Sequence, residues 1–452
     1  MIRRSYSQLC NVYQEMETSS SPTTSLTKTI WKASVRSIRV QSTWESFSKQ
    51  VISQLPLLDS RDIATVIHSF ARVKFKDEKL LGSIIPSILR NLNDFSVREI
   101  VSILSAFRKL EYSRLDCMDL LVNQLVIQST EWNEIDCALI ANALGYFRVF
   151  DKDIWKCIQN HILKRNENLS PLGIGLIVGA LAKLDMRNER LLRKLSRTLV
   201  NSVGGVMKQE SFAIIVHGFY KLDWTEDFIL NEFLECQMEN FLQLEAFFDK
   251  QSLCMILHAL FCYRVPNEAK PLTEQQNRIL VSGIESLLKE DAWKPDTDQL
   301  KRLNDLVLLY NDSNRIVSDL GRFIAKNRLS ESKRSEEKKT LKLPRWEYEV
   351  FRILKEKMQV PVRRHKKDKR VDLIVPRDGE KDVVVLCLGP FQFYADSTKR
   401  TASSKSLQRI LEAQGRKVME IPFFIWNELK SDEDKVMYLY SLGRRVYKST
   451  LE

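Results

Sequence analysis

A unit of about 37 residues recurs along much of the chain, and it limits the possible folds more than any other feature of the sequence. Six segments align without gaps, and their starts lie 37, 37, 37, 38 and 41 residues apart. They are LDSRDIATVIHSFARV (from Leu58), FSVREIVSILSAFRKL (Phe95), WNEIDCALIANALGYF (Trp132), LSPLGIGLIVGALAKL (Leu169), MKQESFAIIVHGFYKL (Met207) and FDKQSLCMILHALFCY (Phe248). A degraded copy follows near Pro295. A fixed period of this length is typical of stacked repeats.

Each copy places apolar residues three and four positions apart, which puts them on one stripe of a helix. In the first copy this stripe is Ile63, Val66 and Phe70. A small residue precedes the third apolar position in every copy: Ser69, Ala106, Ala143, Ala180, Gly218 and Ala259. A second apolar segment, such as EKLLGSIIPSILRNL, completes each unit. The sequence therefore predicts a mostly α protein, with an α-solenoid of about six to seven helical hairpins over residues 50–325.

Two further columns of the repeat are polar. One contains His68, Ser105, Asn142, Gly179, His217 and His258, and the other contains Arg72, Lys109, Tyr146, Lys183, Lys221 and Cys262. If these helices line a concave face, the columns would contact phosphates or base edges of RNA, and Arg72, Lys109, Lys183 and Lys221 are the candidate contacts. The alternative is that the histidines bridge neighbouring helices and the cations are solvated. A metal site is not expected, because the histidines are one repeat apart.

The charge of the chain favours a polyanionic partner. Lys and Arg number 70 against 58 Asp and Glu, and +8 of the net +12 lies in residues 341–452. Nucleic acid is the commonest partner of such a protein. No apolar run is long enough for a membrane span. The eight cysteines form no C-x-x-C pair, which argues against zinc and against a disulfide framework, and no cofactor is expected.

Composition divides the rest of the chain. Residues 1–45 are rich in Ser and Thr and contain six Lys or Arg, a pattern shared by organellar transit peptides and by disordered tails. Residues 326–342 form a charged linker.

The hydrophobic period changes in residues 343–452, which predict a compact α/β domain. Its expected helices are in LPRWEYEVFRILKEKM, SLQRILEAQG and DKVMYLYSLGRRVY, and its expected strands are in VDLIVP, DVVVLCLGP and KVMEIPFFIW.

This domain resembles the RAP domain, which ends many organellar RNA-associated proteins of apicomplexans, algae and plants and the animal FAST-kinase-domain family. The matching marks are Gly389-Pro390, Phe393-Tyr394, the spacing from Thr401 to Lys405, Gly415, Ile421-Pro422 and Trp426. Helical repeats before the domain fit the same families. The resemblance implies a fold similar to PD-(D/E)XK nucleases.

The family commonly carries two acidic residues on the strand before Gly-Pro, and here those positions are Leu386 and Leu388. Of the acidic residues expected on these two strands, only Asp372, on the preceding strand, is present. Hydrolysis of a phosphodiester with a metal ion needs carboxylates to hold the ion and a water. We therefore expect binding without catalysis. A nuclease built on Asp372 with displaced ligands is the alternative.

The RAP-like domain also supplies most of the candidate RNA contacts. The densest basic run gives Arg363, Arg364, Lys366, Lys367, Lys369 and Arg370, and the stretch after Gly-Pro gives Gln392, Tyr394, Lys399, Arg400 and Lys405. Phe391 and Phe393 either stack on bases or close a small core.

The sequence thus predicts a mitochondrial RNA-binding protein, with a plastid location as the alternative. Its expected role is to bind rRNA, including fragmented rRNA, as a component or assembly factor of the mitochondrial ribosome, alongside ribosomal or other organellar proteins and without a membrane. The alternatives are a factor for the stability or processing of organellar transcripts, or a scaffold that binds only protein.

Overall fold

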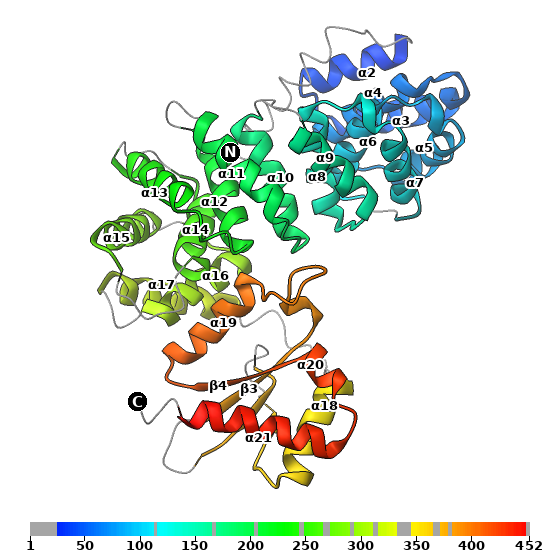
Figure 1. The fold of residues 1–452 in the computed structure, drawn as a ribbon. Helices are drawn as coiled ribbons and strands as arrows, with labels where there is room; N and C mark the ends of the chain where they lie inside the picture. The colour runs from blue at the N-terminus through cyan, green and yellow to red at the C-terminus, as the bar shows by residue number, and fades with distance from the viewer. Residues whose placement is uncertain are drawn as a thin grey trace. The chain divides into compact units, whose positions relative to one another are not determined.

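The chain folds into two compact units, Met1–Phe219 (unit 1) and Tyr220–Glu452 (unit 2). The computed structural model describes residues 25–112, 115–164, 169–202, 207–243, 248–264, 272–289, 293–310, 315–331, 345–364, 371–377 and 382–448. Figure 1 shows helices throughout unit 1 and a small sheet at the end of unit 2.

Unit 1 consists of helical hairpins, as the repeat predicts. Its helices are α2 (Ser25–Val35), α3 (Gln41–Gln54), α4 (Ser60–Val73), α5 (Glu78–Arg90), α6 (Val97–Lys109), α7 (Leu115–Ile127), α8 (Glu134–Phe147), α9 (Lys152–Lys164), α10 (Pro171–Lys183), α11 (Glu189–Ser202) and most of α12 (Gln209–Lys221). Single turns of 3₁₀ helix, η1 (Leu55–Leu57), η2 (Leu92–Asp94) and η3 (Ser129–Glu131), precede α4, α6 and α8.

The first residues of each repeat explain where its first helix begins. An apolar residue, such as Phe95 or Trp132, is buried just before the helix. The next residue caps the helix: the side chains of Asp59, Ser96, Asn133 and Ser170 each accept a hydrogen bond from the backbone N–H three residues on. This combination of a cap and a preceding apolar contact fixes the helix start.

The same helices end in a repeated turn. A left-handed residue with φ between 51° and 62° follows the helix by one or two positions: Ser37, Lys74, Glu111, Arg148 and Asp185. The next N–H returns to the carbonyl of the third apolar column: Phe75 to Phe70, Tyr112 to Phe107, Val149 to Leu144, and Met186 to Leu181, at 2.9–3.0 Å. This is the Schellman arrangement, in which the residue after the left-handed one also contacts the helix. The rings of Phe70 and Phe75 lie 6.0 Å apart.

The hairpin array starts earlier than predicted. Residues 1–45 were expected to be a transit peptide or a disordered tail, but α2 and α3 form a further hairpin, and α2 packs against α4. Ser37 lies 37 residues before Lys74 and adopts the same left-handed turn. Alignment misses this copy because Thr29 and Ala33 stand where the second and third apolar columns should be. Residues 1–24 lie outside the described residues.

The small residues of the repeat let helices approach closely, as predicted. A Cβ built on Gly145 of α8 would come within 2.6 Å of the Ala180 Cα in α10. A Cβ on Gly218 of α12 would come within 2.6 Å of Val178. A larger side chain at either position would therefore push the neighbouring helix away.

Unit 2 begins with the end of α12 and continues the hairpins. It contains α13 (Phe228–Gln243), α14 (Lys250–His258), α15 (Glu274–Leu288), α16 (Thr297–Tyr310) and α17 (Arg315–Glu331). The last turn of the first helix in this copy is a π-helix, η4 (Ala259–Tyr263). The degraded copy near Pro295 is real: α16 packs on α14, and α17 packs on α15 and α16. The array extends to Glu331, past the predicted end at 325, and residues 332–344 lie outside the described part.

A four-stranded sheet follows in unit 2. Its strands are β1 (Arg363–Arg364), β2 (Leu373–Val375), β3 (Val383–Leu388) and β4 (Lys417–Pro422), in the order β1-β2-β3-β4. β1, β2 and β3 are antiparallel and β4 runs parallel to β3. The helices are α18 (Arg345–Arg352), continued by the π-helix η5 (Ile353–Lys357), α19 (Ala402–Ala413), α20 (Phe423–Glu428) and α21 (Asp432–Lys448), with the 3₁₀ turn η6 (Pro390–Gln392).

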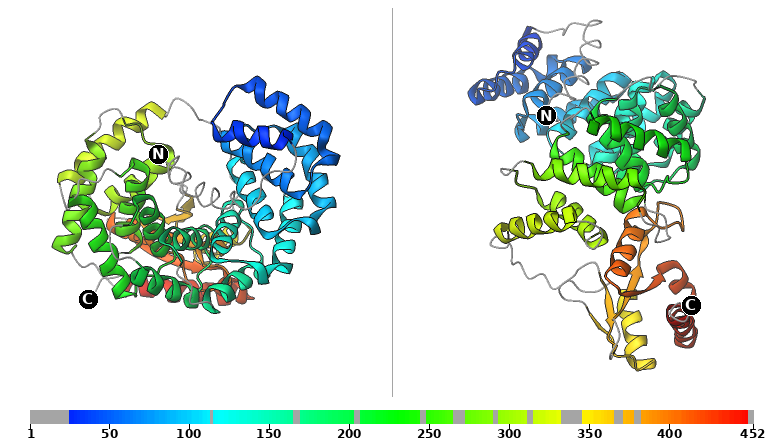
Figure 2. Two further views of the ribbon diagram at one scale, coloured as in Figure 1. Left: turned by 90° about the horizontal axis from the view of Figure 1, so that it is seen from above. Right: turned by 90° about the vertical axis from the view of Figure 1, so that its left-hand side faces the viewer.

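The predicted order of helices and strands in this domain is confirmed with two corrections. Arg363 and Arg364 form an edge strand, where the sequence indicated only a basic run. The predicted strand KVMEIPFFIW ends at Pro422, and Phe423 begins α20. Helices α18 and α21 cover one face of the sheet, as Figure 2 shows, and α19 contributes to the other.

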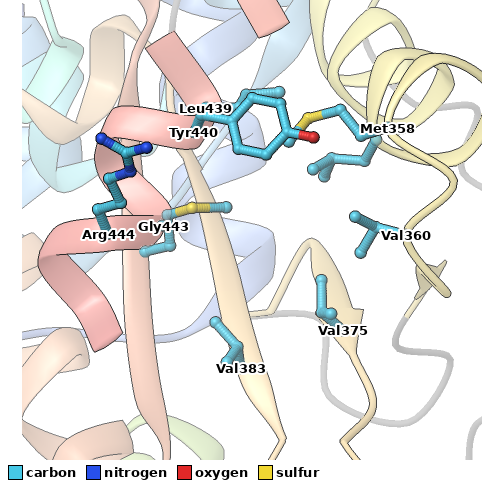
Figure 3. A pocket seen from close by; sticks show the side chains of 10 residues that line it. Met358, Val360, Val375, Val383, Leu439, Tyr440, Gly443 and Arg444 are labelled. Atoms are coloured by element: carbon cyan, nitrogen blue, oxygen red, sulfur yellow. The ribbon is translucent and has the colours of Figure 1, made fainter. Parts of the chain in front are cut away.

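The α18–α21 face contains an apolar pocket of about 190 Å³ where β3 begins. Met358, Val360, Val375 and Val383 line it, with Tyr440 and Arg444 of α21 at its rim (Figure 3). Its volume is below the roughly 300 Å³ of small-molecule sites. No helix in the described part of the chain is long and apolar enough to cross a membrane.

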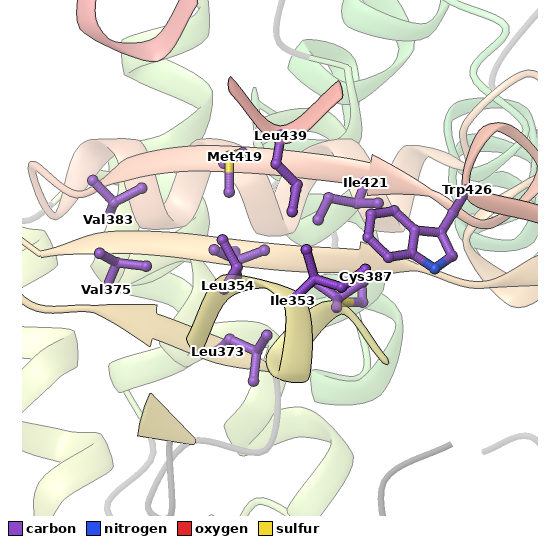
Figure 4. Packing of buried hydrophobic residues seen from close by; sticks show 12 residues of the cluster. Ile353, Leu354, Leu373, Val375, Val383, Cys387, Met419, Ile421, Trp426 and Leu439 are labelled. Carbon is purple, nitrogen blue, oxygen red and sulfur yellow. The ribbon is translucent and has the colours of Figure 1, made fainter. Parts of the chain in front are cut away.

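The rest of that face is closed by a core of side chains from the helices and three strands. Ile353 and Leu354 meet Leu373, Cys387 and Ile421, with Trp426 at one end (Figure 4). The opposite face buries Ile374, Val384, Leu386, Leu388 and Phe393 against Leu411 of α19. Because both faces of β3 are covered, its sequence is continuously apolar rather than alternating.

Candidate nucleic-acid interface

Strand β3 places the two substituted acidic positions in the core. Leu386 and Leu388 are buried on the α19 face, in one cluster with Phe393 and Leu411. A carboxylate there would lose its hydration, and Arg400, the cation beside Glu420 on the neighbouring strand, is already paired with Glu420. Leucine at positions 386 and 388 therefore fits the packing around β3.

Two carboxylates remain near the end of β3. The Asp372 carboxylate accepts a hydrogen bond of 2.8 Å from the Cys387 N–H. Burial nevertheless raises the pKa of Asp372 to about 6. Glu347 at the start of α18 lies close enough for Asp372 to influence it: burial and the Asp372 charge raise the pKa of Glu347 to about 7.

Neither carboxylate belongs to a larger cluster. Within the described ranges, no group of three or more His, Cys, Asp or Glu side chains is placed to hold a metal ion. Asp382 instead lies 3.5 Å from Arg363, and Asp396 lies in an exposed left-handed turn. Sequence reasoning identified Asp372 but not Glu347, which is one of several charged residues on an amphipathic helix.

The segment after Gly-Pro packs against the repeat helices of unit 2. Tyr394 is 1% exposed. Its hydroxyl donates to the Lys221 carbonyl at 2.7 Å and accepts from the Ala402 N–H at 3.1 Å. Lys405 forms a 2.7 Å ion pair with Asp223. The expectation that Tyr394 and Lys405 reach RNA assumed that both are accessible, and the structure instead places both against the end of α12.

Helix α19 extends this contact to the next repeat. The Ser403 hydroxyl donates to the Tyr263 hydroxyl at 3.2 Å, and the Arg409 guanidinium donates to the Cys262 carbonyl. We call Lys221, Asp223, Cys262 and Tyr263 the repeat seat. The carbonyls at a helix C-terminus lack partners within the helix and attract positive charge, so Arg409 and the Tyr394 hydroxyl satisfy groups that the repeats leave open.

Arg400 is also engaged within the domain. Its guanidinium pairs with Glu420 of β4 and donates to Gln408 at 2.7 Å and to the Ser404 carbonyl at 2.9 Å. This network holds the start of α19 to β4. A side chain with so many internal partners is poorly placed to meet a phosphate.

Other predicted cations lie at the opposite edge of the sheet. Arg363 and Arg364 are exposed on β1. The guanidinium of Arg364 lies 5.9 Å from the centre of the Phe351 ring, and the Lys355 ammonium lies 5.7 Å from the same ring. Tyr348 is 52% exposed beside Phe351, with the two rings 6.4 Å apart. We call Tyr348, Phe351, Lys355, Arg363 and Arg364 the edge patch.

Arginine stacked on aromatic rings at a surface is a common RNA-binding arrangement. Sequence reasoning missed Tyr348, Phe351 and Lys355 because their spacing in an amphipathic helix does not reveal which strand lies beside them. Lys366, Lys367, Lys369 and Arg370, which continue the basic run after Arg364, lie outside the described residues.

The edge patch and the Gly-Pro turn lie toward the same end of the sheet. Arg364 pairs with Leu373, near the start of β2, and β2 runs antiparallel to β3. Leu373 pairs with Val385, so β3 continues three residues past the start of β2 to Leu388, and the Gly-Pro turn lies beyond the edge patch in the same direction along the sheet. Gln392 and Lys399, the remaining candidates of the domain, are half-buried beside this end of β3.

The candidate cations of unit 1 have mixed surroundings. Lys183 is exposed, whereas Arg72 and Lys109 are half-buried near His68. Burial and these two positive charges lower the pKa of His68 to about 3, so His68 is neutral at physiological pH. In unit 2, His258 lies 3.5 Å from Asp305 of α16, which is the bridging role that the alternative interpretation assigned to the histidines.

Helical hairpins followed by this docked α/β domain define a RAP-domain protein with N-terminal helical repeats. The sequence model of the RAP domain matches residues 385–442. The model described as RNA-editing substrate-binding complex 8 protein matches residues 48–260, within the helical part. No curated protein matches the chain.

Proposed function

We infer that this protein binds single-stranded RNA and does not cleave it. The edge patch carries this inference, because it combines exposed arginines with the exposed ring of Tyr348 and the half-buried ring of Phe351 in a net-positive domain. Phosphates supply most of the affinity for such a surface and rings accept unpaired bases. The RAP-domain match supports RNA as the ligand.

The proposal of binding without catalysis rests on the positions of Leu386 and Leu388. Both side chains fill the core, so the acids that the family commonly carries on this strand have no equivalent on β3. Asp372 and Glu347 alone give two carboxylates with raised pKa values. Holding Mg²⁺ and an attacking water takes more oxygen ligands than this pair offers.

We further propose that the protein acts in an RNA-processing assembly in the mitochondrion. The match of the helical part to RNA-editing substrate-binding complex 8 protein supports this role. It favours processing over the ribosomal role that the sequence suggested.

Binding can be tested with the purified full chain and a labelled single-stranded RNA over a series of salt concentrations. Wild type is expected to lose affinity steeply as salt rises. The double variant Arg363→Glu/Arg364→Glu is expected to reduce the slope of log K against log salt by about 1.4, since each phosphate contact on a single strand contributes roughly 0.7.

A matched control makes the same change in charge elsewhere in the domain, at exposed Lys430 and Arg444. Lys430→Glu/Arg444→Glu is expected to leave the slope close to that of wild type. Equal slopes for the two double variants would remove the edge patch from the interface. Negligible RNA affinity of wild type even at low salt would favour a scaffold that binds only protein.

Catalysis and assembly need separate experiments. Incubation of the RNA with protein and Mg²⁺ or Mn²⁺ is expected to leave it intact. Cleavage that disappears in Asp372→Ala would establish the nuclease alternative instead. Sedimentation of a tagged protein in organelle lysate distinguishes the two roles: co-migration with ribosomal subunits would contradict the processing role.

A further inference from the structure

Phe391 is exposed, although the two aromatic residues that follow it, Phe393 and Tyr394, are buried. Its side chain is 93% exposed, and no large hydrophobic side chain among the described residues is more exposed. Two residues on, Phe393 is buried against Phe423 and Phe424, with ring centres 5.9 and 5.2 Å away. Burying a phenylalanine stabilises a fold by roughly 1.5–3 kcal/mol, so this position forgoes a stabilisation that Phe393 obtains.

The backbone around Phe391 is held firmly. Gln392 and Phe393 donate their N–H groups to the Gly389 and Pro390 carbonyls at 3.0 and 3.1 Å, closing the single 3₁₀ turn η6. The Gln392 carbonyl accepts from the Thr401 N–H at 2.9 Å. With Phe393 in the core on one side and the Pro390 ring on the other, the turn holds the Phe391 ring outside the core.

We propose that Phe391 is a stacking site for one unpaired nucleobase of the bound RNA, which rests on the proposed function. A rigid ring at the surface presents its face to a base with little loss of side-chain entropy, and every base has a face to offer. The site lies at the carboxyl end of β3, toward which the edge patch also lies. A strand bound there by its phosphates has its bases within the same region.

Two polar residues of the same segment, Gln392 and Lys399, are assigned to the site as well. The Oε1 atom of Gln392 lies 3.4 Å from the position that a Cβ on Gly389 would occupy. The Gln392 side-chain amide therefore lies beside the turn. The Lys399 carbonyl accepts from the Tyr394 N–H at 2.9 Å, which keeps Lys399 in the segment that runs alongside. The Gln392 amide can form hydrogen bonds with a base edge, and the Lys399 ammonium group can pair with the adjoining phosphate. The ligand class is thus single-stranded RNA, and a duplex, whose bases are stacked on each other, is excluded from this site.

The test compares full-length wild type and Phe391→Ala on a single-stranded RNA that contains 2-aminopurine, whose fluorescence falls when it stacks. Wild type is expected to quench the fluorescence. Phe391→Ala is expected to lose the quenching and to bind about tenfold more weakly, in line with the effect of removing one stacked base. Because the ring has no charge, the salt slope should not change, unlike in Arg363→Glu/Arg364→Glu.

Phe228→Ala is the matched control, since Phe228 is 75% exposed at the start of α13, directly after Glu226 and Asp227. It should bind and quench as wild type does, and Phe391→Tyr should restore both properties. Quenching and affinity in Phe391→Ala equal to wild type would overturn the proposal and leave the exposed ring to a protein partner. An equal loss of affinity for single strand and blunt duplex would also overturn it. If wild type binds no RNA, the proposed function itself fails.

Discussion

The first helix of a hairpin ends in a left-handed residue in both units, but the surroundings of that turn differ. In unit 1 the turns at Lys74, Glu111 and Arg148 return a hydrogen bond to their own helix. In unit 2 the equivalent residue, Asp223, has φ of 56° and pairs with Lys405 of the RAP domain. The same turn that ends a repeat helix is thus also the place where the RAP domain docks in unit 2. Glu111 and Asp185 are also acidic at the equivalent turns of unit 1, so the charge of Asp223 alone does not distinguish the docking turn, beside which Tyr394 also donates to the Lys221 carbonyl.

The largest expected effect comes from reversing the charge of Lys405. Lys405→Glu removes the pair with Asp223 and puts two carboxylates together, which should lower the free energy of unfolding of unit 2 by about 2–3 kcal/mol for a partly buried pair. Thermal unfolding and amide hydrogen exchange of residues 220–223 and 259–263 measure this. The double variant Asp223→Lys/Lys405→Glu should recover most of the loss, and its failure to do so would show that the pair does not hold the domain.

Acidification should destabilise unit 1 through His68. The pKa of His68 is about 3 in the folded chain against 6.5 for an ordinary histidine, so the unfolded chain takes up the proton first. Its contribution to stability is therefore complete above pH 6.5 and is lost as pH falls toward 3, by about 2 kcal/mol between pH 7.5 and 5. Thermal unfolding of His68→Gln across this range should show a weaker pH dependence than wild type.

The RAP domain should respond to pH in the opposite direction. The pKa values of Asp372 and Glu347 are raised to about 6 and 7, so the folded domain favours their protonated forms. Stability should therefore fall as pH rises through these values, and the shift of Asp372 alone should stabilise the domain by about 1–2 kcal/mol on going from pH 7.5 to 5. In Asp372→Asn, which keeps an acceptor for the Cys387 N–H, much of this gain should disappear. A gain of wild-type size in that variant would assign the pH response to other groups.

The smallest expected effect concerns the left-handed residues themselves. Glycine adopts positive φ without the clash of a Cβ, so Arg148→Gly should stabilise unit 1 by about 0.5–1 kcal/mol in chemical denaturation. Asp223→Gly has the same gain in backbone energy but loses the ion pair with Lys405, and should not stabilise unit 2. Equal stabilisation by the two variants would mean that the docking pair is worth little.

The repeats were predictable because their signal is periodic. Equivalent residues such as Ile63, Ile100 and Ile174 pack in the same way in each copy of the repeat. Each copy therefore supports the assignment of the others. The hairpin of α2 and α3 escaped prediction because Lys32 and Ala33 depart from the pattern, although Leu26 and Ile30 still bury their side chains.

The candidate site was less predictable, since it depends on contacts between residues far apart in the chain. Tyr394 and Phe391 are both aromatic residues after the same Gly-Pro, yet one is buried and the other exposed. The backbone geometry of the turn η6 determines which of the two rings is buried. No local sequence pattern predicts that geometry. Lys405 and Arg363 likewise look equivalent in the sequence, yet Lys405 is half-buried in a 2.7 Å pair with Asp223, whereas Arg363 is exposed on β1 with Asp382 at 3.5 Å.

The repeat seat has a consequence for how such proteins change in length. All four of its residues belong to the hairpins that begin with α12 and α14, and the RAP domain contacts them through its own loop and α19. Whole hairpins could be gained or lost ahead of α12 without altering any of these contacts. The length of the hairpin array and the attachment of its terminal domain can therefore evolve independently.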